Sequence, residues 1–207
     1  MTATIRDFRP GDEQAAYYVC MRTGDHGKDG EPFFRADPDA LGRIYVGPYL
    51  KFSPELSLIV EDNEGVCGYA LATFDSHEFF ERYEKEWRPA LCEQFEDPAG
   101  DSSSWDRVQE THHLYHDPDY YCPEPYDQYP SHLHIDFLSR VRGQGIGRRM
   151  IEELVRRLRS MKSPGVHLGM SDVNEQAYGF YRALGFEELI RHDGAIYLGM
   201  KLPPESA

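Results

Sequence analysis

Short stretches of the chain alternate apolar and polar residues or form brief apolar runs, which is typical of strands with one or two buried faces. Seven such stretches occupy residues 4–8, 56–61, 66–73, 132–138, 166–170, 186–190 and 195–201. The sequence D-N-E-G between the second and third stretches favours a hairpin turn. In the fourth stretch the alternation places His132, His134 and Asp136 together on one face of the strand.

Apolar residues with a helical period separate these strands. They predict helices over residues 11–22, 37–49, 146–158 and 175–184. The chain therefore reads β-α-α-β-β followed by β-α-β-α-β-β, with a different kind of segment between the two halves. Its 207 residues suit one domain, residues 1–207, with one large insertion.

The insertion, residues 77–130, carries fourteen Asp or Glu against four Lys or Arg, and six tyrosines. Helical propensity covers residues 78–95 and again 105–114, after which the segment is too rich in proline for regular structure. A solvated acidic surface is the simplest explanation of the charge. The alternative is a lid of carboxylates and aromatic rings over a site for a cationic amine or a basic peptide.

The net charge of −14 argues against a nucleic-acid partner, because such proteins need a positive surface. Apolar runs are too short to span a membrane, and the N-terminal residues lack the apolar core of an export signal. The four cysteines show no C-x-x-C spacing, which favours reduced thiols. We therefore expect a cytoplasmic protein without a membrane partner, and a homodimer stays an open alternative.

The sequence R-G-Q-G-I-G, residues 142–147, joins the polar-faced strand to an amphipathic helix. Glycines at such a junction let an anion approach free backbone N–H groups at the start of a helix. The spacing G-x-G-x-G differs from the dinucleotide pattern G-x-G-x-x-G, and no Lys-Ser or Lys-Thr pair follows as in a nucleotide-triphosphate loop. The loop nevertheless predicts a seat for a phosphate or pyrophosphate.

Residues 142–147 resemble the pyrophosphate loop of GNAT acetyltransferases, Gln/Arg-x-x-Gly-x-Gly/Ala, and residues 174–186 resemble that family's N-x-x-A-x-x-F-Y-x-x-x-G-F motif. The resemblance implies the GNAT fold: an α/β (α+β) protein with a mixed, mostly antiparallel sheet of about seven strands, four flanking helices and here a long insertion between the third and fourth strands. It also implies an acetyl-CoA site. The residues expected to line it are Phe137, Leu138, Arg142, Gly143, Gln144, Gly145, Ile146, Gly147, Arg148, Asn174, Ala177 and Tyr181.

A narrower resemblance joins this chain to the acetyltransferase-like C-terminal domain of O-GlcNAcase. It rests on R-P-G-D-E near the N-terminus, on residues 61–75, and on E-F-F-E-R-Y-E-K-E-W-R-P in the insertion. That animal domain is described as lacking the cofactor motif, whereas this chain has the complete loop. The fold and the insertion are therefore expected here without the inactivity.

The resemblance implies transfer of acetyl from acetyl-CoA to an amine by direct attack in a ternary complex, with the acceptor a small amine or a peptide lysine. Backbone N–H groups at a bulge around Phe137 and Leu138 would polarise the thioester, and Tyr181 would act as general acid. The general base is His134 or Asp136, or both together; histidine has the better ordinary pKa. No metal is expected, although His112, His113, His116, Asp117, Asp119 and Cys122 gather potential ligands in the insertion. The alternative function is a non-catalytic module that binds acetyl-CoA or a peptide.

Overall fold

Seven strands form one sheet in the computed structural model, which describes residues 3–122, 124, 126–192 and 194–203. The strands are β1 Thr4–Asp7, β2 Ser57–Asp62, β3 Gly65–Thr73, β4 Ser131–Phe137, β5 Gly165–Ser171, β6 Glu187–His192 and β7 Ala195–Lys201. Their order in the sheet is β1-β2-β3-β4-β5-β7-β6, and every neighbouring pair is antiparallel except β4 with β5. The predicted strands and the mixed, mostly antiparallel sheet are confirmed.

Helices α1 Glu13–Thr23, α8 Ile146–Ser160 and α9 Glu175–Ala183 agree with the predicted ones. The single helix predicted over residues 37–49 is wrong. The chain forms two short helices, α3 Ala40–Tyr45 and α4 Gly47–Phe52, and a further short helix, α2 Glu31–Phe34, precedes them. Pro48 lies in the first turn of α4, where its missing N–H costs nothing, whereas inside one continuous helix it would break a hydrogen bond.

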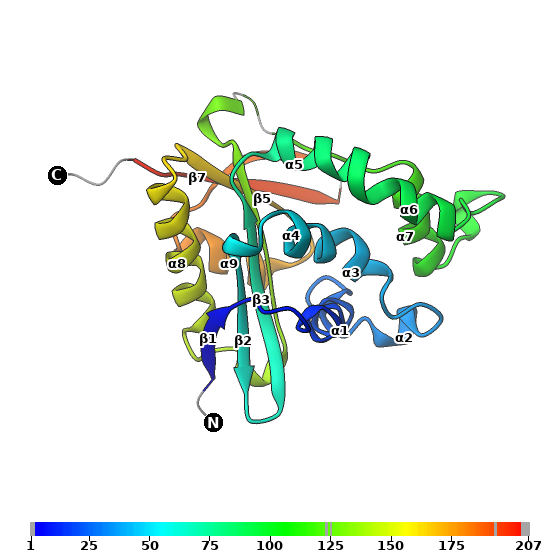
Figure 1. Ribbon diagram of the computed structural model, residues 1–207, viewed down its shortest axis with the longest axis horizontal. Coiled ribbons are helices and arrows are strands. Elements are labelled where there is room, and N and C mark those ends of the chain that lie inside the picture. The colour runs from blue at the N-terminus through cyan, green and yellow to red at the C-terminus, as the bar shows by residue number, and fades with distance from the viewer. Residues whose placement is uncertain (1–2, 123, 125, 193, 204–207) are drawn as a thin grey trace.

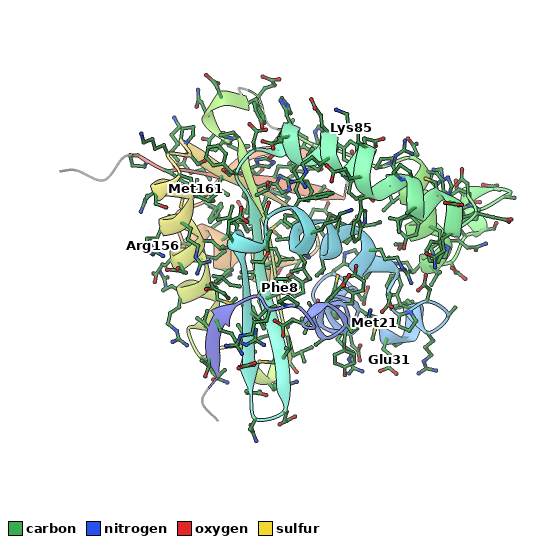
Figure 2. All side chains as sticks on the ribbon, viewed as in Figure 1. Phe8, Met21, Glu31, Lys85, Arg156 and Met161 are labelled. Atoms are coloured by element: carbon green, nitrogen blue, oxygen red, sulfur yellow. The ribbon has the colours of Figure 1, made fainter. Side chains whose placement is uncertain are left out.

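Helices cover both faces of the sheet (Figure 1), and a buried apolar cluster lies on each face. Helix α8 packs on one face, where Met150, Ile151 and Leu154 join β4 residues such as Leu133 in a buried cluster. Helices α1, α3 and α4 pack on the other face around the fully buried ring of Tyr69. Side chains fill the space between the sheet and the helices (Figure 2). The alternation along β4 therefore sends its polar side chains towards the α1 face.

The insertion forms a helical arm beside the sheet (Figure 1). Helix α5 Ser76–Arg82 continues through a π-helical turn, Tyr83–Trp87, into α6 Arg88–Gln94, and α7 Arg107–His116 follows after a reciprocal capping box at Asp106. The arm leaves and re-enters the sheet at adjacent points, because the backbone N–H of Ser76 donates to the carbonyl of Pro130 over 2.8 Å. Both helices predicted for the insertion are present.

Strands β4 and β5 part from each other along their length. Their ladder holds only Ser131 with Val166 and His132 with His167, and further on no pairs join them. Pairing of β4 with β3 continues without a shift from His132 to Phe137. The result is an opening inside the sheet at the carboxyl ends of β4 and β5, next to the glycine loop.

Within the part of the chain that the structure describes, every helix is too short or too polar to traverse a lipid bilayer.

Candidate active site

A cleft of about 560 Å³ lies where β4 and β5 part, on the α1 face of the sheet. We call it the main cleft. Residues from seven stretches of the chain line it: Cys20, Thr23, Gly24, His26, Gly27, Leu41, Ile44, Tyr45, Tyr49, Phe79, Phe80, Tyr83, Leu114, Pro118, Asp119, Tyr120, Tyr121, His132, Leu133, His134, Asp136, His167, Leu168, Gly169, Met170, Ser171, Gly194, Ala195 and Tyr197. These described lining residues include the carboxylates Asp119 and Asp136 and no Lys or Arg. The cleft therefore favours a cationic ligand.

The glycine loop adopts the backbone that its sequence predicts. Gly143 and Gly145 have φ of 75° and 70°, in the left-handed region, and a Cβ at either position would meet nothing within 4 Å. Gly145 is the N-cap of α8 and provides no side-chain cap, so the first N–H groups of this fifteen-residue helix have no partner within the helix. Exposed Arg148 and Arg149 follow in the first turn. This arrangement suits a phosphate group.

Arg142 ties the glycine loop to the other side of the main cleft. Its guanidinium donates to the carbonyl of Gly27, 2.7 Å away in the α1–α2 loop, and to the carbonyl of Phe137 at 3.2 Å. The side chain of Gln144 donates to the carbonyl of Arg140. Two of the polar side chains expected at the cofactor thus fix the shape of the loop itself.

The second motif forms the start of α9. The Oδ1 atom of Asn174 caps the helix by accepting from the N–H of Ala177 over 3.1 Å. The amide nitrogen of the same side chain lies beside Gly27, where a Cβ would approach it to 2.8 Å. Arg142 and Asn174, one from each sequence motif, therefore both lie next to Gly27 of the α1–α2 loop, and Arg142 donates a hydrogen bond to it.

Gly147 and Ile146, two other residues expected at the cofactor, are positioned by close packing. A Cβ on Gly147 would approach the ring of Phe180 to 3.0 Å, so glycine lets α8 lie against α9. Ile146 is buried under the loop.

The N–H groups at the end of β4 differ in their availability. The N–H of Leu138 donates to the carbonyl of Cys67 over 2.9 Å and is therefore engaged. Because N–H groups alternate in direction along an antiparallel strand, that of Phe137 faces the opening towards β5. The bulge expected at these two residues is not seen, since the register with β3 is regular as far as Phe137. Of the two, Phe137 alone presents a free donor direction.

The predicted polar face of β4 forms a hydrogen-bonded cluster with β3. The hydroxyl of Tyr69 donates to Oδ2 of Asp136 over 2.6 Å and lies 2.9 Å from Nε2 of His134, which is 3.2 Å from the same Oδ2. The Tyr69 hydroxyl has one hydrogen, and it donates that hydrogen in the bond to the carboxylate of Asp136. The Nε2 of His134 must therefore be the donor in its own contacts, which leaves Nδ1 of a neutral ring with a free lone pair.

Cys20 of α1 lies next to this cluster. Its sulfur, Nδ1 or Nε2 of His134 and a carboxylate oxygen of Asp136 lie within 4.8 Å of one another, the one such group of potential metal ligands among the described residues. Burial and the nearby Asp136 raise the pKa of the Cys20 thiol, which keeps it protonated. The hydroxyl of Tyr69 already bonds the other two members, so the geometry present is that of a proton network.

Tyr181 is buried on α9, with its ring against Phe180 and Phe186. Burial, and to a smaller extent the charge of Asp136, raises the pKa of its hydroxyl. A tyrosine with a raised pKa keeps its proton at neutral pH and can donate it.

The other two strand histidines, His132 and His167, make structural contacts beside the cleft. Nδ1 of His132 lies 2.6 Å from the hydroxyl of Ser76, and Nδ1 of His167 lies 2.8 Å from the carbonyl of Tyr129. Burial lowers the pKa of both rings, that of His132 most strongly. Both histidines are therefore neutral at pH 7.

The histidines of the insertion do not gather. His112 lies 2.8 Å from Asp37, His113 lies 2.8 Å from Asp97, and His116 contacts the carbonyl of Phe95. These contacts anchor α7 to different neighbours. Sequence reasoning missed Tyr69 and Cys20, and it missed Tyr45 and Tyr49 as walls of the cleft, because none of them belongs to a motif.

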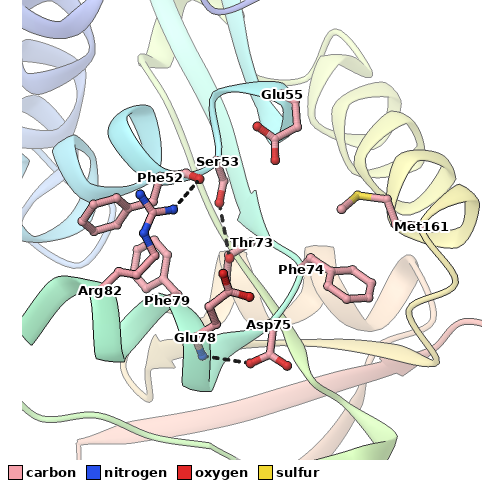
Figure 3. Close-up of a pocket in the computed structure, with 10 residues that line it drawn as sticks. All are labelled: Phe52, Ser53, Glu55, Thr73, Phe74, Asp75, Glu78, Phe79, Arg82 and Met161. Atoms are coloured by element: carbon pink, nitrogen blue, oxygen red, sulfur yellow. Dashed lines mark hydrogen bonds between the residues drawn. The ribbon is translucent and has the colours of Figure 1, made fainter.

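A second hollow of about 200 Å³ lies at the base of the insertion (Figure 3). Its polar groups are largely engaged: Asp75 accepts from the N–H of Glu78, Ser53 bonds Thr73, and Arg82 donates to the carbonyl of Phe52. No sequence motif reaches this hollow. The main cleft is therefore the candidate site.

Comparisons with known proteins identify the family and the fold. A model of the acetyltransferase (GNAT) domain matches residues 53–188. The crystal structure of SsHAT superposes with a TM-score of 0.89 at 32% identity, covering 98% of this chain and 100% of that one. A putative acetyltransferase from Salmonella typhimurium, solved with its cofactor acetyl-CoA, has a TM-score of 0.55 at 14% identity, covering 100% and 98% of the two chains, and shares the fold.

Among curated proteins, the protein O-GlcNAcase of Rattus norvegicus is 29% identical over 192 residues, which are 92% of this chain. The match covers 21% of that protein, so the chain spans about a fifth of the length of this relative.

Proposed function

The chain belongs to the GNAT acetyltransferase family, and on that basis we propose that it is an acetyl-CoA-dependent N-acetyltransferase acting on a cationic amine. The observation that carries the proposal is the His134–Asp136–Tyr69 cluster, which faces a cleft without Lys or Arg among its described lining residues. A base is thus placed where a cationic amine would be attracted.

The glycine loop fits the pyrophosphate of acetyl-CoA. Open space above Gly143 and Gly145, the free start of α8 and the exposed arginines of its first turn all favour a bulky anion. Asn174 and Ala177 at the start of α9, and the N–H of Phe137, which faces the opening between β4 and β5, are the further groups proposed to contact the cofactor. When bound there, acetyl-CoA would supply an activated acetyl thioester.

His134 is the proposed general base. Its Nδ1 atom has no hydrogen-bond partner among the described residues and can accept a proton from an ammonium. The positive charge then formed on the ring is stabilised by Asp136, whose Oδ2 lies 3.2 Å from Nε2. Tyr69 fixes the orientation of both groups. Asp136 therefore acts together with His134 rather than in competition with it.

Tyr181 is the proposed general acid. Its hydroxyl keeps the proton because burial raises the pKa, and it lies near enough to Asp136 to feel that charge. The tyrosine can supply a proton to a leaving thiolate. The proposed base and acid thus belong to different elements, β4 and α9. Tyr181 packs in the buried cluster on the α8 face and is not among the described residues that line the main cleft.

The proposal is tested by titrating the protein with acetyl-CoA in a calorimeter and by measuring acetyl-dependent release of free thiol over a panel of amines. Binding with turnover that falls about 100-fold or more in His134→Gln would support it. Binding without turnover on any acceptor would favour the non-catalytic alternative. Lack of binding would overturn the proposal. His192→Gln, at an exposed position of β6, is the matched control.

A further inference from the structure

Two consecutive tyrosines carry the chain across the main cleft. We call residues 118–121 the strap. Tyr120 stacks on Phe80 of α5 with ring centroids 4.6 Å apart, and its hydroxyl donates to Glu84 over 2.6 Å. Tyr121 stacks on Tyr197 of β7 with centroids 3.6 Å apart. Tyr120 therefore fixes the strap to the first helix of the insertion, and Tyr121 fixes it to β7 of the sheet.

The elements held by the strap stand on opposite sides of β4 and β5. Phe80 also stacks on His132 of β4, whereas Tyr197 belongs to β7, the neighbour of β5 on its far side. The strap thus passes over the closed end of the opening, and His132 and His167 beneath it are only 6% and 3% exposed. An extended polypeptide that lay across this end of the cleft would have to displace the strap.

The main cleft, which the strap crosses, has the size of a small-molecule site. Its volume of about 560 Å³ must also hold the reactive end of acetyl-CoA, and pockets for single small ligands measure roughly 300–1,000 Å³. Seven of its lining side chains are tyrosine or phenylalanine outside the strand motifs: Tyr45, Tyr49, Phe79, Phe80, Tyr83, Tyr120 and Tyr121. Such walls favour an apolar or aromatic body next to the ammonium group.

One lining group lacks a partner. The hydroxyl of Tyr83 is buried and has no hydrogen-bond partner among the described residues, although the residue is only 2% exposed. A buried hydroxyl without a partner is unfavourable, so a bound ligand that offers a polar group would be stabilised there.

We propose that the acceptor is a small free primary amine with an aromatic or apolar body, and that the strap excludes lysine side chains held within a polypeptide. This inference rests on the proposed acetyltransferase function. Asp119 and Asp136 would attract the ammonium group, the rings would enclose the body, and the strap would set the size limit.

The test compares two primary amines at saturating acetyl-CoA: 2-phenylethylamine and a blocked Gly-Lys-Gly peptide. The expected kcat/KM is at least about tenfold higher for the small amine, because the peptide backbone has no place under the strap. Tyr121→Ala removes the stack on Tyr197 and should reduce that ratio at least about threefold. A peptide turned over as well as the small amine by the unchanged protein would overturn the inference.

The matched control is Tyr126→Ala. Tyr126 belongs to the same segment, but it stacks on His77 at 3.7 Å and does not line the main cleft. It should leave the ratio unchanged, and an equal change in both variants would overturn the role of the strap. If neither these two amines nor any member of the amine panel is turned over, the acetyltransferase proposal fails. Calorimetry in the presence of coenzyme A then decides the inference separately: tighter binding of the small amine supports it, and tighter binding of the peptide overturns it.

Discussion

Tyr69 and Asp136 face each other across β3 and β4 as direct ladder partners, and the phenol donates to the carboxylate over 2.6 Å. Burial and the charge of Asp136 raise the pKa of Tyr69 well above its ordinary value, so this proton stays on the phenol. The sheet register therefore determines which nitrogen of His134 keeps a free lone pair.

Replacing Tyr69 with phenylalanine tests this relationship. We expect kcat to fall between about 10- and 100-fold with little change in KM for the amine, because the base loses its orientation but is still present. Loss of a hydrogen bond to a charged group should also lower the free energy of unfolding by about 1.5–3 kcal/mol. Steady-state kinetics and urea denaturation measure both effects.

The control for that variant is Tyr115→Phe, which removes a buried hydroxyl that donates to the carbonyl of Ala40 outside the main cleft. It should lose stability and keep kcat. Equal loss of kcat in the two variants would mean that Tyr69 acts only through folding.

Gly145→Glu should abolish acetyl-CoA binding. The φ of 70° costs a residue with a side chain about 1–2 kcal/mol, and the added carboxylate would occupy the space where an anion is expected. Affinity measured by calorimetry should fall at least about 100-fold, as expected when a like charge replaces an attractive site.

Two further glycine variants separate strain from charge. Gly145→Asn tolerates the same φ and should retain most of the affinity. Gly100→Glu has a comparable strain, with φ of 95° in open surroundings away from the main cleft, and should leave binding intact. Undiminished binding by Gly145→Glu would contradict the phosphate seat.

Tyr181→Phe should lower kcat by about 100-fold or more while acetyl-CoA binding is preserved, because a proton donor is lost and the ring is retained. Tyr178, on the same helix, provides the control. Tyr178→Phe removes a hydroxyl that bonds Glu188 on the exposed side and should have little effect. Single-turnover thiol release would show the difference directly, and an unchanged rate in Tyr181→Phe would exclude it as the acid.

The buried histidines predict a loss of stability in mild acid. Burial lowers the pKa of His132 and His167 in the folded protein, whereas the unfolded chain protonates near 6.5. Below that pH the unfolded state binds more protons, so the free energy of unfolding decreases as pH falls, by at most about 1.4 kcal/mol per pH unit for each histidine. Above about pH 7 both rings are neutral in the folded and the unfolded chain, so their protonation no longer lowers the free energy of unfolding.

Urea denaturation at several values between pH 7.5 and 5.5 measures this slope. His132→Gln should be less stable at pH 7.5 and show a flatter pH dependence, whereas His192→Gln, at an exposed position, should keep the original slope. A slope unaffected by the His132 substitution would assign the acid sensitivity to other groups.

Local sequence patterns were sufficient to predict all seven strands, because alternation and turn residues act over a few positions. They were not sufficient for the helices between α1 and β2. Apolar spacing over residues 37–49 suggested one helix, but Pro48 and the close packing of Gly47 on the rings of Tyr17 and Trp87 require two. Packing against residues from distant segments decided that break.

For the site, sequence could identify groups on motifs and on the polar strand face, and the structure brings His134 and Asp136 together. Tyr69 and the strap could not be found that way. Their roles depend on the β3–β4 register and on where a 54-residue insertion returns to the sheet, and both are long-range properties. The catalytic assignments of these residues stay predictions that the variants above can test.

The hydrogen bond between Ser76 and Pro130 has an evolutionary consequence. A segment whose two ends meet one hydrogen bond apart can lengthen, shorten or be exchanged without altering the strands beside it, since the cost of closing a loop grows slowly with its length. The strands and the glycine loop could thus be inherited unchanged while the insertion diversified. On the proposed function, acceptance of new amines would then require replacement of only one contiguous piece of the gene.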